Sequence, residues 1–432
     1  MVSPQATGNI PFHLSFMNCT RSCFARCVHP CALPRRPAAR HAQSSPWQVP
    51  IPTLVLRRRS TFGLLSRLDD GTRVDEPLKA IPSLDAAHPY SKIGAEKIAA
   101  YDNEIKTLLK EVGIPVEGDA TRNRYVISAS GALKPAWLTV EDIASVADKT
   151  EKIGSKALII NVEGFLDFNT SFIAESLEKR GTACRIAAVT TDEIRRLRQN
   201  PSEMRATNIA RLLDKEEVRT KLTGAIKALV NDEDCIILPA VFGLKDNAAG
   251  HKIAEDLKIK TLFVGTLPPS VPGIRYQMAL KTAFEAAGGT FLKGDEAVGA
   301  EFDGDKVSAV RTANMGDILL TGENYILASG SYFGHGLISD SEKVYEPVFG
   351  ADVIFNADRN TWYDKNFFHK QEYIGFGVDT DEKFHVRKEG RSITNLYASG
   401  SVLGGFNPLH EGCGAGVALM TAFNITDSIL GR

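Results

Sequence analysis

The residues best suited to chemistry lie near the C-terminus, in a loop between a short apolar strand and an apolar, alanine-rich helix. The stretch 395–424 reads NLYASGSVLGGFNPLHEGCGAGVALMTAFN, and its loop carries six glycines: Gly400, Gly404, Gly405, Gly412, Gly414 and Gly416. Glycines let the backbone approach a flat ligand, and a helix start offers unpaired N–H groups at its positive dipole end. The pattern predicts a seat for a pyrimidine edge or a phosphate. The alternative is a tight β–α connection without a ligand.

A second stretch of interest is the proline-rich segment GTLPPSVPGIR at 265–275. Three prolines within five residues rigidify a loop at the end of an expected strand, which is where α/β proteins place ligands. Arg275 is expected to open a helix that runs to Gly288. Its guanidinium would then grip a phosphate with two hydrogen bonds, and the alternative is a surface arginine at a helix start.

Strands alternating with helices must position these segments. The central part of the chain contains four short, β-branched runs: ALIINV (157–162), CRIAAV (184–189), CIILPAV (235–241) and TLFVGT (261–266). Helical stretches at 169–179 and 214–229 lie between them. This alternation predicts a mainly parallel, doubly wound α/β layer.

The flanking parts of the chain contain further recognisable elements. The segment 88–113 predicts a helix that stops at Gly113, preceded by a turn, HPYS, in which His88 looks exposed and structural. The region 290–330 is β-rich and turns at 303–304, and the last helix is expected to end at Gly431.

Composition is that of a globular protein, with 43% apolar and 24% charged residues and no apolar run of 18 residues. Residues 60–432 hold 43 basic and 52 acidic side chains, a net charge of −9 that argues against a nucleic-acid partner. Cys184, Cys235 and Cys413 are scattered, as expected for reduced thiols, and Cys413 is expected to fill space in the glycine loop.

The first 59 residues differ from the rest of the chain. They contain eight arginines but no lysine, aspartate or glutamate, and Gly8 is their only glycine. Their four cysteines recur at every fourth position, from Cys19 to Cys31, which matches no common zinc spacing. We expect this segment to pack poorly and to add no regular strand to the sheet that carries the glycine loop.

Several separated motifs resemble one family of flavoproteins. NLYASGSVLGGF followed by GCGAGVAL resembles the C-terminal flavin-binding segment of the succinate dehydrogenase and fumarate reductase type, and YILASGSY (325–332) resembles a strand and turn of its cofactor domain. Four further motifs resemble the B-subunit family of anaerobic glycerol-3-phosphate dehydrogenases: TLPPSVPGIR (266–275), MRATNIARLLD (204–214), FGVDTDEKF (376–384) and GSVLGGFNP (400–408). The resemblance covers roughly residues 62–432.

This resemblance implies a Rossmann-like flavin-binding α/β domain with an inserted α/β domain that covers the substrate. The implied division is an aberrant or disordered segment at 1–59, a discontinuous flavin domain at 60–110 and 275–432, and the insertion at 111–274. The cofactor implied is FMN, with FAD as the alternative. The residues expected to bind it are Ser329, Gly330, Gly400, Ser401, Gly404, Gly405, Gly412, Gly414, Gly416 and Val417.

The resemblance also implies a reaction, the oxidation of sn-glycerol 3-phosphate to dihydroxyacetone phosphate with electrons passing to a quinone in anaerobic respiration. Such a substrate needs cations for its phosphate, for which Arg275 and Arg205 are candidates, and a base for its hydroxyl proton, for which His410 or His335 is a candidate. Two alternatives remain open. One is a flavoenzyme of the same fold acting on another small hydroxy acid or a dicarboxylate, and the other is a flavin-less scaffold subunit.

The partners implied are a larger flavoprotein, the A-subunit, and a membrane-bound iron–sulfur protein, the C-subunit. The iron–sulfur protein would hold the chain at the cytoplasmic face of the inner membrane, without a membrane span of its own. No metal site is expected, because no cysteine cluster suited to an iron–sulfur centre lies beyond the N-terminal segment.

The family implied here opens with a strand and a G-x-G-x-x-G turn that seats the cofactor diphosphate. Residues 1–59 stand in that place with almost no glycine. Three explanations are open: a reading-frame or start error upstream of about Thr61, an organelle transit peptide, or real divergence.

Overall fold

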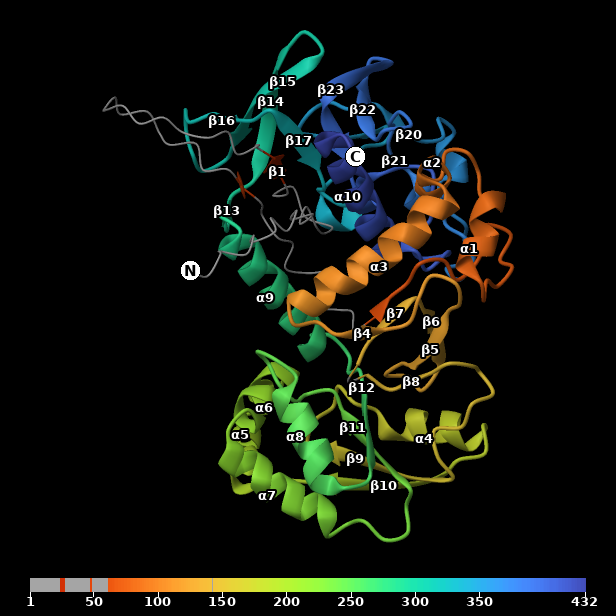
Figure 1. The fold of residues 1–432 in the computed structure, drawn as a ribbon, viewed down its shortest axis with the longest axis vertical. Helices are drawn as coiled ribbons and strands as arrows, with labels where there is room; N and C mark the ends of the chain where they lie inside the picture. Colours follow the sequence, from red (N-terminus) through yellow and green to blue (C-terminus); the bar gives the residue numbers. More distant parts are fainter. Residues whose placement is uncertain (1–23, 28–46, 49–60, 142) are drawn as a thin grey trace, which may run out of the picture.

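The computed structural model describes residues 24–27, 47–48, 61–141 and 143–432. The described residues contain two four-stranded sheets, one formed mainly by C-terminal strands and one formed by strands from the middle of the chain. Smaller sheets lie between the two (Figure 1). No helix of the described residues is long and apolar enough to cross a membrane.

The C-terminal sheet carries the predicted glycine loop and has the strand order β1-β17-β23-β22. Strands β17 (Asn324–Leu327) and β23 (Arg391–Ala398) are parallel, with Tyr325 opposite Leu396, and β22 (His385–Lys388) is antiparallel to β23. Helix α10 (Gly414–Leu430) follows the loop, and most of its residues are buried. It ends at Gly431, whose φ of +70° is the left-handed conformation that glycine adopts at a helix end, as predicted.

Residues 24–27 correct one expectation about the N-terminal segment. They form β1 (Phe24–Cys27), which pairs antiparallel with β17 at the edge of the C-terminal sheet. An edge strand presents a row of free backbone donors and acceptors, so an extended segment of almost any composition can pair with it. The prediction that residues 1–59 add no strand to this sheet is therefore wrong, and most of that segment lies outside the described residues.

The central layer is a four-stranded, fully parallel sheet of order β10-β9-β11-β12. All four predicted strands are confirmed, as β9 (Lys156–Val162), β10 (Ala183–Val189), β11 (Cys235–Pro239) and β12 (Lys260–Val264). One helix covers one face and the others cover the opposite face (Figure 1), as α/β crossovers require. These helices are α4 (Thr170–Glu178) on the first face and α5 (Asp192–Arg198), α6 (Ala206–Leu213), α7 (Glu216–Lys227) and α8 (Ala248–Leu257) on the second.

Short helices and two small sheets connect the layers. The predicted helix before Gly113 is confirmed as α3 (Ala95–Glu111), and the fully buried Trp137 donates its indole N–H to the Asp102 carboxylate at 2.6 Å. The other elements of this region are α1 (Pro77–Ala80), α2 (Pro89–Ile93), β3 (Thr61–Phe62), β4 (Val116–Glu117), β5 (Arg124–Ile127), β6 (Leu133–Ala136), β7 (Leu138–Val140) and β8 (Ser145–Val146).

The return to the C-terminal sheet runs through α9 (Val271–Ala286) and a hairpin. Arg275 does not open this helix, because the Ser270 hydroxyl caps it by accepting from the Gly273 N–H at 3.3 Å. The predicted turn at 303–304 is confirmed. The hairpin and the short strands after it are β14 (Ala297–Asp303), β15 (Lys306–Thr312), β16 (Leu320–Thr321), β18 (Ile338–Ser339), β19 (Val344–Tyr345), β20 (Val353–Ile354) and β21 (Gly377–Val378). The division into domains stays a prediction.

Candidate active site

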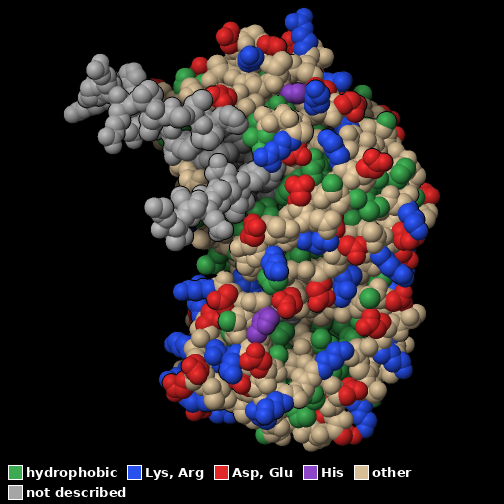
Figure 2. All heavy atoms as spheres, viewed as in Figure 1, with side chains coloured by type: hydrophobic (Ala, Val, Ile, Leu, Met, Phe, Trp, Pro, Cys, Tyr) green, Lys and Arg blue, Asp and Glu red, His purple; other side chains and the backbone are tan. Residues whose placement is uncertain are grey.

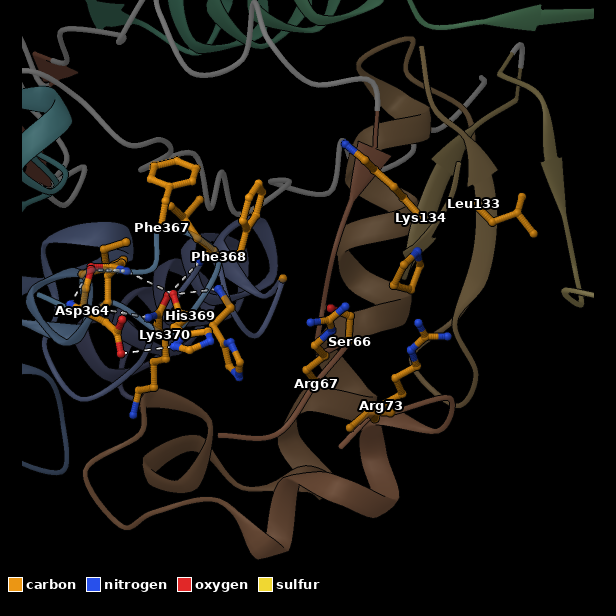
Figure 3. Close-up of a pocket in the computed structure, with 18 of the residues that line it drawn as sticks. Ser66, Arg67, Arg73, Leu133, Lys134, Asp364, Phe367, Phe368, His369 and Lys370 are labelled. Carbon is orange, nitrogen blue, oxygen red and sulfur yellow. Dashed lines mark hydrogen bonds and ion pairs between the residues drawn. The ribbon is translucent and has the colours of Figure 1, made fainter. Parts of the chain in front are cut away.

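A cleft of about 1390 Å³ lies where four segments of the chain meet. They are the stretch after β3, the β5–β6 hairpin with the end of α4, the loop 363–374, and the glycine loop. Figure 3 shows Lys134 and Arg73 on one side of this cleft and Phe367 and Phe368 on the other. Its volume exceeds what one small metabolite needs.

Positive charge dominates the cleft. Only Asp75 and Asp364 contribute carboxylates to its lining, against eight cations: Arg67, Arg73, Lys134, Lys149, Lys179, Arg180, Lys365 and Lys370. Three of these are ion-paired, Lys149 to Asp75 at 2.9 Å, Lys179 to Glu175 at 2.6 Å and Lys370 to Asp69 at 2.6 Å. Within the described part of the chain, the other five have no carboxylate partner. The cleft is therefore suited to an anion.

One wall of the cleft is a loop with two outward phenylalanines. Phe367 is 83% exposed and Phe368 is 92% exposed. The loop is nevertheless braced from within, since the Gln371 side-chain amide donates to the carbonyls of Asp364, Asn366 and His369 at 3.0–3.3 Å. These hydrogen bonds fix the backbone of the loop, while the two phenylalanine side chains face solvent.

Another part of the lining comes from the glycine loop, which contributes Gly412, His410 and Asn407. It is bound to the stretch after β3, because the backbone N–H and hydroxyl of Ser66 donate to the Glu411 carbonyl at 2.7 and 2.8 Å. Gly412 is required at its position, since it has a φ of +68° and a Cβ there would lie 2.3 Å from the Ser66 hydroxyl.

Beneath the loop, the buried Glu411 carboxylate collects three donors. One oxygen accepts from the Asn407 N–H at 2.8 Å, and the other accepts from His88 Nε2 at 2.9 Å and from the Cys413 thiol at 3.3 Å. His88 Nδ1 accepts from the Tyr90 N–H at 3.0 Å, which leaves Nε2 as the proton donor. Hydrogen bonds therefore satisfy this group, although its ligand-type atoms lie within 4.8 Å of one another as metal ligands do.

These contacts revise the expectation for the turn at His88 and add a hydrogen bond to the expectation for Cys413. His88 is 2% exposed and caps α2, so the exposed-looking turn is in fact buried, although the structural role expected for His88 agrees with this contact. Cys413 fills buried space as expected, and its thiol also donates a hydrogen bond. Burial raises the pKa of the neighbouring Tyr90 well above its usual value, so its phenol stays a neutral donor to the Leu64 carbonyl at 2.9 Å.

Three further loop glycines are explained by contacts within the protein. A Cβ on Gly404 would lie 2.8 Å from the Gly377 carbonyl oxygen, one on Gly405 would lie 2.7 Å from the Ala87 carbonyl oxygen, and one on Gly416 would lie 2.3 Å from the Tyr90 hydroxyl. The Gly416 N–H is also taken, by the Gly63 carbonyl at 2.8 Å, and Val417 is buried behind it. At these positions the glycine is closely approached by other groups of the protein, as in the ligand-free alternative.

The remaining predicted cofactor residues lie together at the carboxyl ends of two parallel strands. Ser329 and Gly330 follow β17, and Gly400 and Ser401 follow β23, where the Gly400 N–H donates to the Thr421 hydroxyl of α10 at 3.2 Å. Gly414 is the first residue of α10. The Ser329 hydroxyl is buried and has no hydrogen-bond partner within the described part of the chain. Such an edge with a free hydroxyl and a helix start is where open α/β sheets bind cofactors, so these residues fit a flavin.

Of the three predicted catalytic residues, His410 alone lies in the lining of the cleft. Its backbone N–H donates to the Asn407 side chain at 3.0 Å, and its buried Nε2 has no hydrogen-bond partner among the described residues. His335 lies instead in an exposed turn after η4 (Tyr332–Gly334), with a φ of +58°.

The two predicted phosphate ligands lie elsewhere. Arg275 is 3% exposed, and its Nη1 donates to the carbonyls of Phe242, Gly243 and Asp246 at 3.0–3.3 Å. Arg205 is an exposed residue at the start of α6. Neither lines the cleft, and the contacts of Arg275 are those of an arginine that braces a loop.

Sequence reasoning missed the cations that do line the cleft. They come from positions as far apart as Arg67 and Lys370, so no local spacing connects them. The one available signal was the segment RLDDGTR at 67–73, in which a glycine turn separates two arginines that form a backbone bridge.

Comparison with known proteins shows the family of the chain. Residues 62–417 match the FAD-binding domain family. Proteins named as the B-subunit of anaerobic glycerol-3-phosphate dehydrogenase are also similar. The protein from Pectobacterium atrosepticum is 40% identical over 370 residues, which cover 85% of this chain and 88% of the relative. Those from Yersinia enterocolitica and Haemophilus influenzae are 35% and 34% identical, over 86% of this chain and 88% and 90% of the relatives.

The chain belongs to the B-subunit family of anaerobic glycerol-3-phosphate dehydrogenases. It is accordingly a flavoprotein of the oxidoreductase class with an α/β fold, as the sequence motifs predicted. Membership of a family of subunits also means that the chain functions within a larger complex of several proteins.

Proposed function

We propose that this chain oxidises sn-glycerol 3-phosphate to dihydroxyacetone phosphate in a quinone-linked complex, with a flavin as the first electron acceptor. The observation that carries the proposal is the cleft itself, in which eight cations and two carboxylates stand beside the flavin-type glycine loop. Glycerol 3-phosphate, which the names of the relatives contain, is a phosphate monoester and therefore an anion.

The flavin, when bound, supplies the acceptor for the hydride that leaves C2 of the substrate. This chain would hold it with Ser329, Gly330, Gly400 and Ser401 at the edge of the C-terminal sheet. The cations would neutralise the phosphate, and His410 would accept the proton of the C2 hydroxyl. Its unpartnered Nε2 and its place in the lining support that role.

For the cofactor we propose FMN, with FAD as the alternative. The family match is to an FAD-binding domain, yet the matched region begins at residue 62, after the place where a diphosphate-binding glycine turn would stand. A chain without that turn would hold a mononucleotide more readily than a dinucleotide. Chromatography of the cofactor released from purified protein distinguishes the two.

We propose as partners the larger flavoprotein A-subunit and the membrane-bound iron–sulfur C-subunit. The latter would hold the chain peripherally at the cytoplasmic face of the inner membrane. Co-purification of the three proteins, and release of this chain from membranes on loss of the iron–sulfur protein, test this assignment.

A second candidate is oxidation of a dicarboxylate or another small hydroxy acid. It is favoured by the gathering of unpaired cations and of His369 and His410 around one cleft, because two carboxylates would be bound by the same groups. Anaerobic addition of each substrate to the purified complex decides between the candidates. Bleaching of the flavin absorbance by glycerol 3-phosphate, and not by malate or glycerol, is expected. Protein without flavin absorbance would point to a scaffold.

A further inference from the structure

We infer that Arg180, with Lys134 as a second cation, forms the subsite that holds the phosphate group of the substrate. This inference deepens the proposed function and rests on it for the identity of the substrate. The subsite lies on the wall of the cleft built from the end of α4 and from β6, away from the glycine loop in sequence.

The Arg180 guanidinium has buried donors without a partner among the described residues. Its Nε donates to the Ser176 carbonyl at 3.3 Å, but Nη1 and Nη2 are buried and have no hydrogen-bond partner among the described residues. Burial lowers the pKa of Arg180, yet a guanidinium stays charged at neutral pH. A buried charged donor without a partner is costly to a folded protein, and a bound anion removes that cost.

Contacts within the protein fix the wall that carries Arg180. The Ser176 hydroxyl donates to the Gly131 carbonyl at 2.6 Å, which ties α4 to the turn between β5 and β6. Gly131 has a φ of +77°, and a Cβ there would lie 2.3 Å from the Phe172 carbonyl oxygen, so only glycine permits this contact. The contact holds the strand that bears Lys134 beside the helix end that bears Arg180.

Arg180 differs from the adjacent Lys179 and from the other arginine considered above, Arg275. Lys179 is paired with Glu175 at 2.6 Å, whereas Lys134 and Arg180 have no carboxylate partner within the described part of the chain. Arg275 presents the opposite case, since backbone carbonyls already accept from its Nη1. The planar pair of free Nη groups on Arg180 matches two phosphate oxygens.

The test combines binding and kinetics on the assembled enzyme. Arg180→Gln is expected to weaken binding of inorganic phosphate, measured by calorimetry, and to raise KM for glycerol 3-phosphate by about 10- to 100-fold. Flavin content and kcat are expected to stay unchanged, and the melting temperature is expected not to fall, because an unpaired buried charge is removed. Lys134→Gln, at an exposed side chain, is expected to raise KM less.

Arg195→Gln is the matched control, because it removes the same charge from an exposed arginine of α5 that is paired with Asp192. Wild-type phosphate binding and an unchanged KM in both Arg180→Gln and Lys134→Gln would overturn the subsite while leaving the proposed function standing. The wild-type enzyme could instead bind phosphate without oxidising glycerol 3-phosphate. Loss of phosphate binding in Arg180→Gln would then support the subsite and contradict the proposed function. Arg180→Lys is expected to recover only part of the lost kcat/KM, because a lysine supplies a point charge in place of the two-pronged contact.

Discussion

Two walls of the cleft, the one formed by the glycine loop and the one formed by α4 and β6, differ in what their polar groups contact. On the glycine-loop wall the buried Glu411 carboxylate accepts from Asn407, His88 and Cys413, whereas His410 Nε2 has no partner among the described residues. On the wall formed by α4 and β6, Arg180 keeps two buried donors without a partner among the described residues. The first arrangement stabilises a shape, and the second leaves binding capacity for a ligand. A site needs both, a rigid support and unsatisfied groups.

The surrounding surface strengthens this contrast. Basic and acidic side chains are interspersed over the face drawn in Figure 2, and residues 60–432 carry a net charge of −9. Eight cations lining one cleft of such a body are not needed for solubility, and their mutual repulsion opposes folding. Binding of an anion is the function that explains them.

The largest expected effect comes from breaking the supporting wall. Gly416→Val would place a Cβ 2.3 Å from the Tyr90 hydroxyl and 2.8 Å from the Gly63 carbonyl oxygen, so the loop must move. We expect a loss of at least about 3 kcal/mol in the free energy of unfolding and loss of bound flavin. Chemical denaturation and flavin absorbance measure these effects.

Gly224→Val is the control, since Gly224 is an exposed residue of α7 with open space around it. It is expected to cost less than about 1 kcal/mol and to retain flavin. Retention of both stability and flavin by Gly416→Val would show that the close contacts at Gly416 do not fix the glycine-loop wall.

A smaller effect is expected when the glycine loop keeps its glycines but loses the Glu411 carboxylate, which accepts its buried hydrogen bonds. Glu411→Ala leaves the Asn407 N–H and His88 Nε2 without a partner in a buried place, at a cost of about 2–3 kcal/mol. Glu411→Gln retains an acceptor oxygen and is expected to recover most of this loss in urea denaturation. Equal stability of the two variants would contradict the role assigned to the carboxylate.

The sequence predicted the contiguous parts of this account and missed the dispersed ones. The four parallel strands were identifiable because each is a β-branched run, and the glycine loop was identifiable because its residues are adjacent. The cleft cations were missed because only folding brings Arg67, Lys134 and Arg180 to one cavity. The pairing of β1 was missed because composition says little about a free strand edge.

Arg275 shows how a correct local signal was misassigned. The Ser-Val-Pro sequence before it is a helix-start signal that places the cap at Ser270, five residues earlier. Arg275→Lys is expected to lower the free energy of unfolding by about 1–2 kcal/mol, because a lysine cannot serve all three carbonyls. KM for glycerol 3-phosphate is expected to stay unchanged, and a raised KM would return Arg275 to the phosphate site.

The smallest effect is expected at a paired charge away from the cleft. Hydrogen bonding to Lys221, and then to backbone and Thr191, lowers the pKa of Glu193 from 4.5 to about 2. A carboxylate with a depressed folded pKa stabilises the protein above its unfolded pKa and loses that contribution as pH falls toward about 2. The melting temperature of the wild type should therefore exceed that of Glu193→Gln slightly at pH 6, and the difference should vanish near pH 2. A difference independent of pH would contradict this pairing.

The contrast between the two walls is tested most directly by locating an anion in the cleft. Crystals of the enzyme soaked in tungstate, a tetrahedral dianion shaped like phosphate, would give an anomalous signal at each bound ion. We predict a peak within hydrogen-bond distance of the Nη atoms of Arg180, and no peak against the glycine loop at Glu411. A cleft without a peak at Arg180, in crystals that bind tungstate elsewhere, would contradict it.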